Sequence, residues 1–263
     1  MRDHFSRAAG LLFFLLHFIF HYSIYSNPTD GVPHSSSRIV GGVGQSEIGN
    51  FSEFQYRYLS HDIMNRNDGY FPFSESGKFN TTFRYYQTLN QFEITKLSLI
   101  KFASFAPFQS NNQLKSYIFD VGIESVTVRA KKNLIDTFQN ERIRVSPWNV
   151  DLAVGYTYQI SGQSTNKALL VSFLGGMKAQ FHPYFKDFYR VGPQAIISFL
   201  YDFGTMKFQF ISAYQYYILL GNQNDFSNTL RMRYSINNSN ELRLDFIKYK
   251  NEQEFVLNYH FMF

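Results

Sequence analysis

The sequence predicts an all-β protein, an antiparallel up-and-down transmembrane β-barrel of about 12 strands. The first observation is the C-terminal segment, in which every second position is large and apolar up to the last residue. These positions are Phe255, Leu257, Tyr259, Phe261 and Phe263. A period of two is that of a β-strand, and a soluble domain rarely ends on a free strand with an aromatic face. A barrel strand that faces lipid and pairs with the first strand accounts for both features.

The second observation is that the same alternation recurs along the chain from Ser37 onward. Turn residues such as Leu89-Asn90, Ser161-Gly162-Gln163 and Gly221-Asn222 separate the alternating runs. A tilted strand needs about 9 to 11 residues to cross a bilayer, and an even number of strands returns both chain ends to one side. The expected strands span residues 37–44, 51–60, 79–88, 91–105, 115–130, 147–160, 166–180, 190–202, 205–219, 226–236, 240–250 and 253–263.

The third observation is that residues 1–26 have the layout of a signal peptide. Arg2 and Arg7 give a positive start, and an apolar run from Ala8 to Phe20 follows. This run is shorter than the roughly 20 residues that a membrane-spanning helix needs, so we expect cleavage. Residues 27–36 then form a polar periplasmic lead-in without periodicity, and residues 37–263 form the barrel domain.

The composition fits an exported barrel and excludes several other classes. The chain has 30 Phe and 19 Tyr, yet its mean hydropathy is only −0.25. An apolar outer face combined with a polar lumen gives such an average, whereas a helical membrane protein does not. The net charge of +5 forms no basic stripe, so nucleic acid is not an expected partner. The sequence has no cysteine, which excludes disulfides, a cysteine nucleophile and thiolate metal sites.

The polar face of the cleanly alternating segments gives the expected lumen. In segment 205–219, Lys207 and Gln209 lie opposite Phe208 and Phe210. The two following segments carry charges of both signs on their polar face, where they can pair across neighbouring strands. The lumen-lining residues predicted in this way are Arg57, Arg84, Lys207, Arg231, Arg233, Glu241, Arg243 and Asp245. Basic residues outnumber acidic ones in this set, which predicts a narrow passage with anion preference.

Two expected strands do not alternate cleanly. Segment 91–105 changes register near Lys101, and Gly175-Gly176 interrupts segment 166–180. β-Bulges or a strand bend would accommodate both irregularities.

A polar segment between the second and third expected strands is far longer than a hairpin turn requires. It contains His61, Asp62, Asp68, Gly69 and Tyr70. The spacing of its two aspartates partly resembles a Ca²⁺ loop, but the alternating oxygen ligands and the distal Glu are missing. Capping of the loop backbone by Asp and Asn side chains is the simpler interpretation, so we predict neither a metal nor a cofactor. With a periplasmic N-terminus this loop lies on the periplasmic side, placed to plug the lumen or to seat a partner.

Motifs around this loop resemble a known family. They are Pro33-His34-Ser35-Ser36-Ser37-Arg38, Tyr56-Arg57-Tyr58, His61-Asp62, Asp68-Gly69-Tyr70, Phe83-Arg84-Tyr85, the segment 92–99 and Ser104-Phe105-Ala106-Pro107. Over about residues 33–125 the chain resembles the C-terminal outer-membrane β-barrel domain of the bacterial family that carries a lacto-N-biosidase-like N-terminal periplasmic domain. It departs from the pattern at Lys101, where an acidic residue is usual.

The resemblance implies a barrel that partners a periplasmic domain with a papain-like fold and a Cys/His constellation. About 33 residues precede the match and the chain has no cysteine, so we expect that domain to be absent and do not carry its activity over. The C-terminal segment also resembles the recognition strand of outer-membrane barrels, which is read by the barrel-assembly machinery. The implied location is the cell outer membrane of a Gram-negative envelope, with membrane lipid as the surroundings.

Three function classes fit the sequence. The first is a non-enzymatic outer-membrane barrel that acts as a narrow, porin-like pore or as a docking scaffold for a periplasmic partner. The second is an outer-membrane lipid hydrolase, which needs a nucleophile and a base at the outer rim; His182, with Asp187 and Arg190 nearby, is the histidine of an expected outer loop. The third is a soluble exported β-sandwich binding protein, because alternation alone does not distinguish it from a barrel. The terminal strand, the signal peptide and the aromatic content favour the first class.

Overall fold

The computed structural model describes residues 37–66, 70, 72–108, 115–129, 142–164, 167–185, 187–218, 223–250 and 252–263. The expected signal peptide and lead-in, residues 1–36, lie outside the described residues, as do Asp68 and Gly69. No helix in the described part of the chain is long and apolar enough to cross a membrane.

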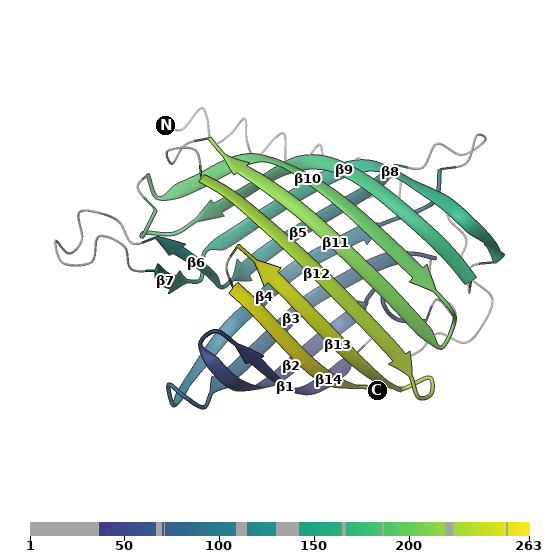
Figure 1. The fold of residues 1–263 in the computed structure, drawn as a ribbon, viewed down its shortest axis with the longest axis horizontal. Helices are drawn as coiled ribbons and strands as arrows, with labels where there is room; N and C mark the ends of the chain where they lie inside the picture. The colour runs from purple at the N-terminus through teal and green to yellow at the C-terminus, as the bar shows by residue number, and fades with distance from the viewer. Residues whose placement is uncertain are drawn as a thin grey trace.

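Twelve strands of the described chain close into one antiparallel barrel (Figure 1). Neighbours in the barrel follow chain order, and the first strand meets the last, from Arg38 opposite Met262 to Ser46 opposite Glu254. The predicted fold class is therefore confirmed. The barrel strands are β1 (Arg38–Ser46), β2 (Gly49–His61), β3 (Ser74–Tyr86), β4 (Gln91–Ser104), β5 (Ser116–Glu124), β8 (Trp148–Ser164), β9 (Lys167–Phe181), β10 (Tyr189–Asp202), β11 (Met206–Tyr217), β12 (Gln223–Ser235), β13 (Asn240–Tyr249) and β14 (Glu252–Met262).

A two-stranded hairpin outside the barrel wall interrupts the chain order between β5 and β8. It consists of β6 (Val126–Arg129) paired with β7 (Arg142–Val145). The strand expected over 115–130 is thus wrong in its second half, because the barrel strand ends at Glu124 and the chain leaves the wall at Ser125.

One of the two expected irregularities of the wall is present and the other is not. The pairing of β4 skips Leu99 against β5, two residues before Lys101, and also skips Thr95 against β3. Gly175 and Gly176 pair with both neighbouring strands without a shift. A Cβ on Gly176 would lie 1.9 Å from a backbone carbonyl oxygen of β8. This glycine therefore permits a close approach of two strands rather than a bulge.

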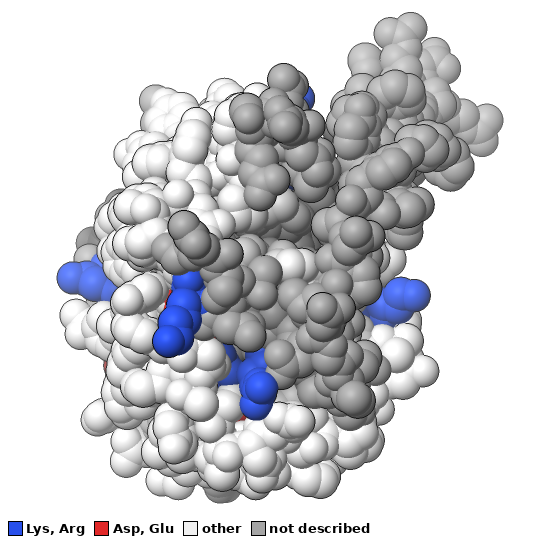
Figure 2. All heavy atoms as spheres, turned by 90° about the vertical axis from the view of Figure 1, so that its right-hand side faces the viewer, with Lys and Arg blue, Asp and Glu red and all other residues white. Residues whose placement is uncertain are grey.

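The outer face of the barrel is apolar. The five residues predicted as the assembly signal, four on β14 and Phe263 directly after it, are exposed, and β10 and β11 expose aromatic residues such as Phe199 and Phe210 in the same way. Figure 2 looks onto the end of the barrel at which β10 turns into β11 and β12 into β13; the described surface in this view is mostly uncharged, with a few Lys and Arg side chains. Because the barrel is closed, none of its twelve strands has a free edge. The backbone N–H and C=O groups of each strand therefore pair with the neighbouring strands, as a chain surrounded by lipid requires. This is the architecture of a barrel in the outer membrane, and the β-sandwich alternative is wrong.

The even strand number places both described chain ends at one rim of the barrel, which we call the chain-end rim (Figure 1). The connection between β2 and β3 lies at this rim; expected over 61–78, it is shorter than predicted because β3 begins at Ser74. The opposite rim carries the β6–β7 hairpin and the 182–188 connection between β9 and β10.

Candidate functional site

The inner face of the barrel has two sides of different chemistry. On β8 to β11, which we call the apolar arc, small and branched apolar side chains form one buried cluster: Ala153, Ala168, Leu170, Leu174, Ile196, Leu200 and Ala213. On β12 to β14 and β1 to β4, which we call the charged arc, the inward register carries Arg and Glu or Asp on most strands. The expectation of a polar, ion-paired lumen is therefore correct for the charged arc. On the apolar arc, ion pairs are confined to the regions near the strand ends, as where Lys207 pairs with Asp202 and Arg190 pairs with Asp225.

The chain between β2 and β3 folds into the lumen at the chain-end rim. We call residues 62–66 the plug. Ile63 and Met64 are fully buried and pack into the cluster of the apolar arc, together with Phe73 and Phe105. The side chains of Asp62 and Asn65 face the charged arc instead. The plug is thus amphipathic and matches the two sides of the wall between which it lies.

Asp62 holds the plug to the charged arc. Its Oδ2 accepts from Arg57 at 2.7 Å and from Arg243 at 2.8 Å, and its Oδ1 accepts from the amide of Met64 at 2.9 Å. Burial raises the pKa of the Asp62 carboxyl, but the guanidinium groups of Arg243, Arg57 and Arg38 outweigh burial and hold this pKa well below its usual range. Both carboxylate oxygens are engaged, which fits the structural role predicted for this residue.

Asn65 and two further cations complete the attachment. The side-chain oxygen of Asn65 accepts from Arg38 at 2.8 Å and from Arg243 at 2.5 Å. The ammonium of Lys207 donates to the backbone carbonyl of Ile63 at 3.2 Å and to that of Asn65. These carbonyls are buried away from water, so the lysine supplies the donors that they need.

His61 and Tyr70 are the other described residues of the predicted loop. Their rings stack with centroids 4.1 Å apart and planes 9° from parallel, and His61 is buried. The stack lies at the end of β2, where the chain turns into the plug.

The structure places all eight predicted lumen residues on the inward register. Three of them are buried at the chain-end rim with ion pairs between them or to their neighbours: Lys207, Arg233 and Glu241. His260 of β14 is buried on the inner face as well. The other five line a cavity beside the plug: Arg57, Arg84, Arg231, Arg243 and Asp245.

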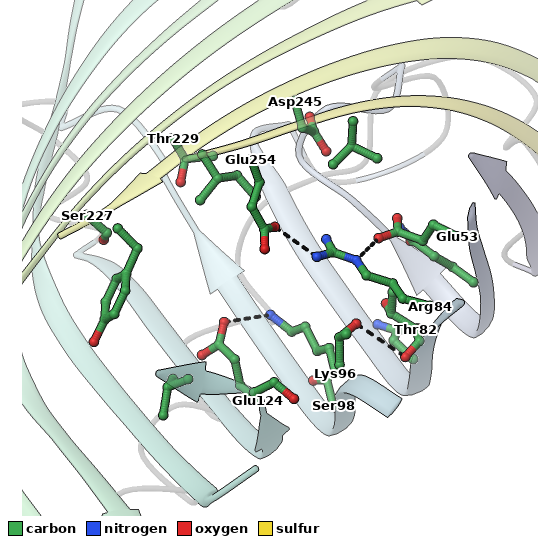
Figure 3. Close-up of a pocket in the computed structure, with 18 of the residues that line it drawn as sticks. Glu53, Thr82, Arg84, Lys96, Ser98, Glu124, Ser227, Thr229, Asp245 and Glu254 are labelled. Atoms are coloured by element: carbon green, nitrogen blue, oxygen red, sulfur yellow. Dashed lines mark hydrogen bonds and ion pairs between the residues drawn. The ribbon is translucent and has the colours of Figure 1, made fainter. Parts of the chain in front are cut away.

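This cavity has a volume of about 320 Å³ and extends from the plug toward the opposite rim (Figure 3). Ion pairs cross it, as where Arg84 binds Glu53 at 2.7 Å and Glu254 at 2.9 Å. The lining holds eight basic and seven acidic side chains, so the predicted excess of positive charge amounts to one basic side chain over the cavity as a whole. Glu252 and Glu254 were missed, although the inward register of the last strand, read back from His260, passes through both.

The β6–β7 hairpin lies at the opposite mouth of the cavity, where Val126, Thr127 and Arg144 contribute to the lining. Arg144 donates to Glu93 of β4 at 2.8 Å. Residues 130–141, most of the outer loop expected over 131–146, lie outside the described residues.

The residues of the hydrolase alternative do not converge. His182 accepts the amide of Tyr184 through Nδ1 at 3.2 Å and stacks on that ring, while burial lowers the pKa of its imidazole. Arg190 points into the barrel, where it pairs with Asp225 at 3.1 Å. Asp187 is exposed. Among the described residues, no serine hydroxyl is hydrogen-bonded to His182, so the histidine has neither a nucleophile nor an orienting acid.

The chain matches, over residues 26–261, the family model described as "Domain of unknown function (DUF7840)". No curated protein sequence matches it. Among solved structures it is similar to the KdgM porin in complex with disordered oligogalacturonate (9% identity, TM-score 0.46, 86% of this chain and 99% of that chain). It is also similar to the Acinetobacter baumannii outer membrane protein Omp33 (12% identity, TM-score 0.38, 88% and 99%). At these TM-scores the similarity says nothing about what passes through this barrel.

Proposed function

The chain belongs to the DUF7840 family, and we propose that it is a non-enzymatic, narrow pore of the cell outer membrane, gated by its plug. The observation that carries the proposal is how the plug is held. In the described structure, residues 62–66 pair with no strand. Side chains attach them to the wall, chiefly Arg57 and Arg243 on Asp62 and Arg38 on Asn65. Such a segment leaves the lumen without breaking the barrel.

The attachment makes the closed state dominant. Separating a buried, hydrogen-bonded charge pair costs about 3 to 5 kcal/mol. A cost of about 3 kcal/mol corresponds to an open fraction below about 1%. With the plug displaced, the polar cavity connects to the chain-end rim. A cavity of about 320 Å³ admits ions and small polar solutes rather than polymers.

Planar-bilayer recording tests the gate. We expect rare, small openings for the wild type and an open fraction at least about ten-fold higher for the double variant Asp62→Ala, Asn65→Ala, which lacks the polar attachment. Arg66→Ala is the matched control, because Arg66 is in the same segment but bonds to Asn238 at the exposed rim. If the double variant migrates as a folded, heat-modifiable barrel and stays silent, the lumen is not a pore.

A docking scaffold for a periplasmic partner is the second candidate. It is supported by the position of the plug, because a partner bound at the chain-end rim would lie against Arg66 and the 236–239 turn and would contact the gate itself. The family resemblance suggests a lacto-N-biosidase-like domain as this partner. A photo-crosslinker at Asn238, with one at Gln45 on the opposite side as control, should capture it in cells; equal capture from both positions would contradict the assignment of the rim.

We also propose that β14 is the strand recognised by the barrel-assembly machinery. Its outward residues Phe261 and Phe263 are exposed, and their rings lie 6.2 Å apart at the end of the chain. Deleting Phe263 should leave the protein degraded or soluble in the periplasm, whereas His260→Ala should insert normally. Equal membrane yields of both variants would contradict the proposal.

A further inference from the structure

Two opposite charges meet in the cavity wall without bonding to each other. Arg231 on β12 and Asp245 on β13 face each other in the antiparallel register, and both line the cavity. Among the described residues, neither forms a hydrogen bond or an ion pair, and the Oδ1 atom of Asp245 is buried without a partner. Figure 3 shows the carboxylate of Asp245 turned into the cavity.

The neighbouring charges in the same cavity behave differently. Lys101 pairs with Glu75 at 2.7 Å and Lys178 pairs with Glu124 at 3.4 Å. Pairing is the general solution in this lumen because an unpaired buried charge is unfavourable. The unpaired Arg231 and Asp245 are therefore exceptions that call for a ligand.

The two side chains are complementary to a molecule that carries both charges. The buried Asp245 oxygen lacks a donor, whereas Arg231 presents donors without an acceptor. An ammonium group has three donors and no acceptor, and a carboxylate has acceptors only. An ammonium bound by Asp245 and a carboxylate bound by Arg231 would therefore satisfy both side chains.

We propose that Arg231 and Asp245 form a binding site for a small zwitterion, the class to which free α-amino acids belong. Arg231 would bind the carboxylate, and the carboxylate of Asp245 would bind the ammonium. Facing residues of an antiparallel pair have Cβ atoms roughly 4.5 to 5.5 Å apart, so one molecule that carries both groups on a single carbon reaches both. The inference rests on the proposed function, because it names what the lumen admits.

The adjacent charges also provide selectivity. A simple anion attracted by Arg231 is repelled by Asp245, and a simple cation meets the reverse. A zwitterion placed in the right direction gains from both. The site should therefore prefer glycine over a molecule that carries only one of its charges.

Saturation-transfer NMR on the detergent-solubilised full chain tests the site without requiring conduction. The probes are glycine, N-acetylglycine, which lacks the ammonium, and glycinamide, which lacks the carboxylate. We expect glycine to bind at least about ten-fold more tightly than either analogue, since each charge-assisted contact contributes on the order of 1.5 to 3 kcal/mol. Equal affinities for the three probes, or no binding of any, would overturn the proposal.

Variants separate a binding role from a structural one. Arg231→Gln should reduce glycine binding to the level of glycinamide, and Asp245→Asn should reduce it to the level of N-acetylglycine. The exchange of charges, Arg231→Asp with Asp245→Arg, should restore part of the binding with the ligand reversed. Lys115→Gln, at an exposed position outside the cavity, is the control. Unchanged glycine binding in Arg231→Gln would refute the site, even where bilayer recordings support the gate; a silent barrel that still selects glycine would refute the gate alone.

Discussion

The apolar arc and the charged arc belong to one continuous wall, but they stabilise the plug in different ways. The apolar arc packs Ile63 and Met64 against Leu170, Leu174 and their neighbours, which is a non-directional contact proportional to the area removed from water. The charged arc holds Asp62 through two guanidinium groups at fixed distances. The apolar arc therefore provides non-directional affinity for the plug, and the charged arc fixes the position of the plug.

The difference implies that the two arcs tolerate opposite kinds of substitution. In the apolar cluster of the apolar arc, a new charge is removed from water and surrounded by apolar side chains. In the charged arc the cavity is polar, and removing one charged side chain leaves its partner as an unpaired buried charge. A barrel lined uniformly by polar residues would show neither effect, so substitutions at matched positions test whether the two arcs are real.

The largest effect is expected from a charge placed in the apolar arc. Leu170→Lys buries an ammonium in the cluster that holds the plug, where the wild-type side chain is 1% exposed. We expect a loss of at least about 3 to 5 kcal/mol or failure to fold, measured as urea-induced loss of the heat-modifiable band. Ile247→Lys is the matched control on the charged arc, because Ile247 lines the polar cavity. Similar losses in both variants would show that the arcs do not differ.

The next effect is expected from Arg243→Met on the charged arc. This arginine binds Asp62, Asn65 and Glu241 at 2.8, 2.5 and 2.7 Å, so its removal leaves two buried carboxylates with fewer partners. The plug should lose about 3 to 5 kcal/mol of attachment, seen as an open fraction raised at least about ten-fold in bilayer recordings. Lys96→Met is the control on the same arc, because Lys96 pairs with Asp120 and Glu124 away from the plug, and it should leave the open fraction unchanged. Equal openings in the two variants would contradict the assignment of Arg243 to the gate.

A smaller effect, equal on both arcs, is expected at the outer face. Phe210→Arg on β11 and Leu257→Arg on β14 each place a guanidinium in lipid, at a cost of about 2 to 4 kcal/mol near the midplane. Both wild-type residues are exposed on the outside, where the chemistry of the lumen has no influence. Unfolding in lipid vesicles gives the two values. A large difference between them would mean that the asymmetry extends through the wall.

The two arcs also differ in how well the sequence predicts them. On β13 and β14 the inward residues are polar and the outward ones apolar, so alternation identifies Arg243 and His260 directly. On β9 it disappears, because inward Leu170 and Leu174 pack the plug while outward side chains such as Phe173 meet lipid. A strand that is apolar on both faces has no period of two.

The plug could be foreseen only as a loop with room to fold inward. Its position depends on contacts between residues far apart in the sequence, such as Asp62 with Arg243 and Lys207 with Ile63. No local pattern encodes these contacts. The unpaired state of Arg231 and Asp245 is equally a property of side-chain geometry, whereas their positions in the lumen follow from alternation alone.

A still smaller effect is expected in ion selectivity. The nearly balanced lining predicts a permeability ratio of chloride to potassium within about two-fold of one. Lys96 is the least buried cation among the ion pairs of the cavity, with 40% of its side chain exposed. Lys96→Glu should therefore shift the reversal potential in a KCl gradient toward cations, while Lys115→Glu outside the cavity should not. A strong anion preference in the wild type would mean that some acidic side chains are neutral.

The smallest effect is expected from acidification above pH 5. Because the folded-state pKa of Asp62 is held well below its usual range, the stability that this group contributes is fully present above its unfolded value of about 4 and is lost only as the pH falls through the depressed folded value. The arginines that contact it keep their charge throughout. The open fraction should therefore stay constant from about pH 7 to pH 5 and rise only below about pH 4, and Asp62→Asn should remove that rise. The other titratable groups around the plug are His61, His260 and Lys207, all buried. A rise centred between pH 5 and pH 7 that persists in Asp62→Asn would contradict the prediction and assign the gate to one of these histidines, which His61→Gln and His260→Gln would then distinguish.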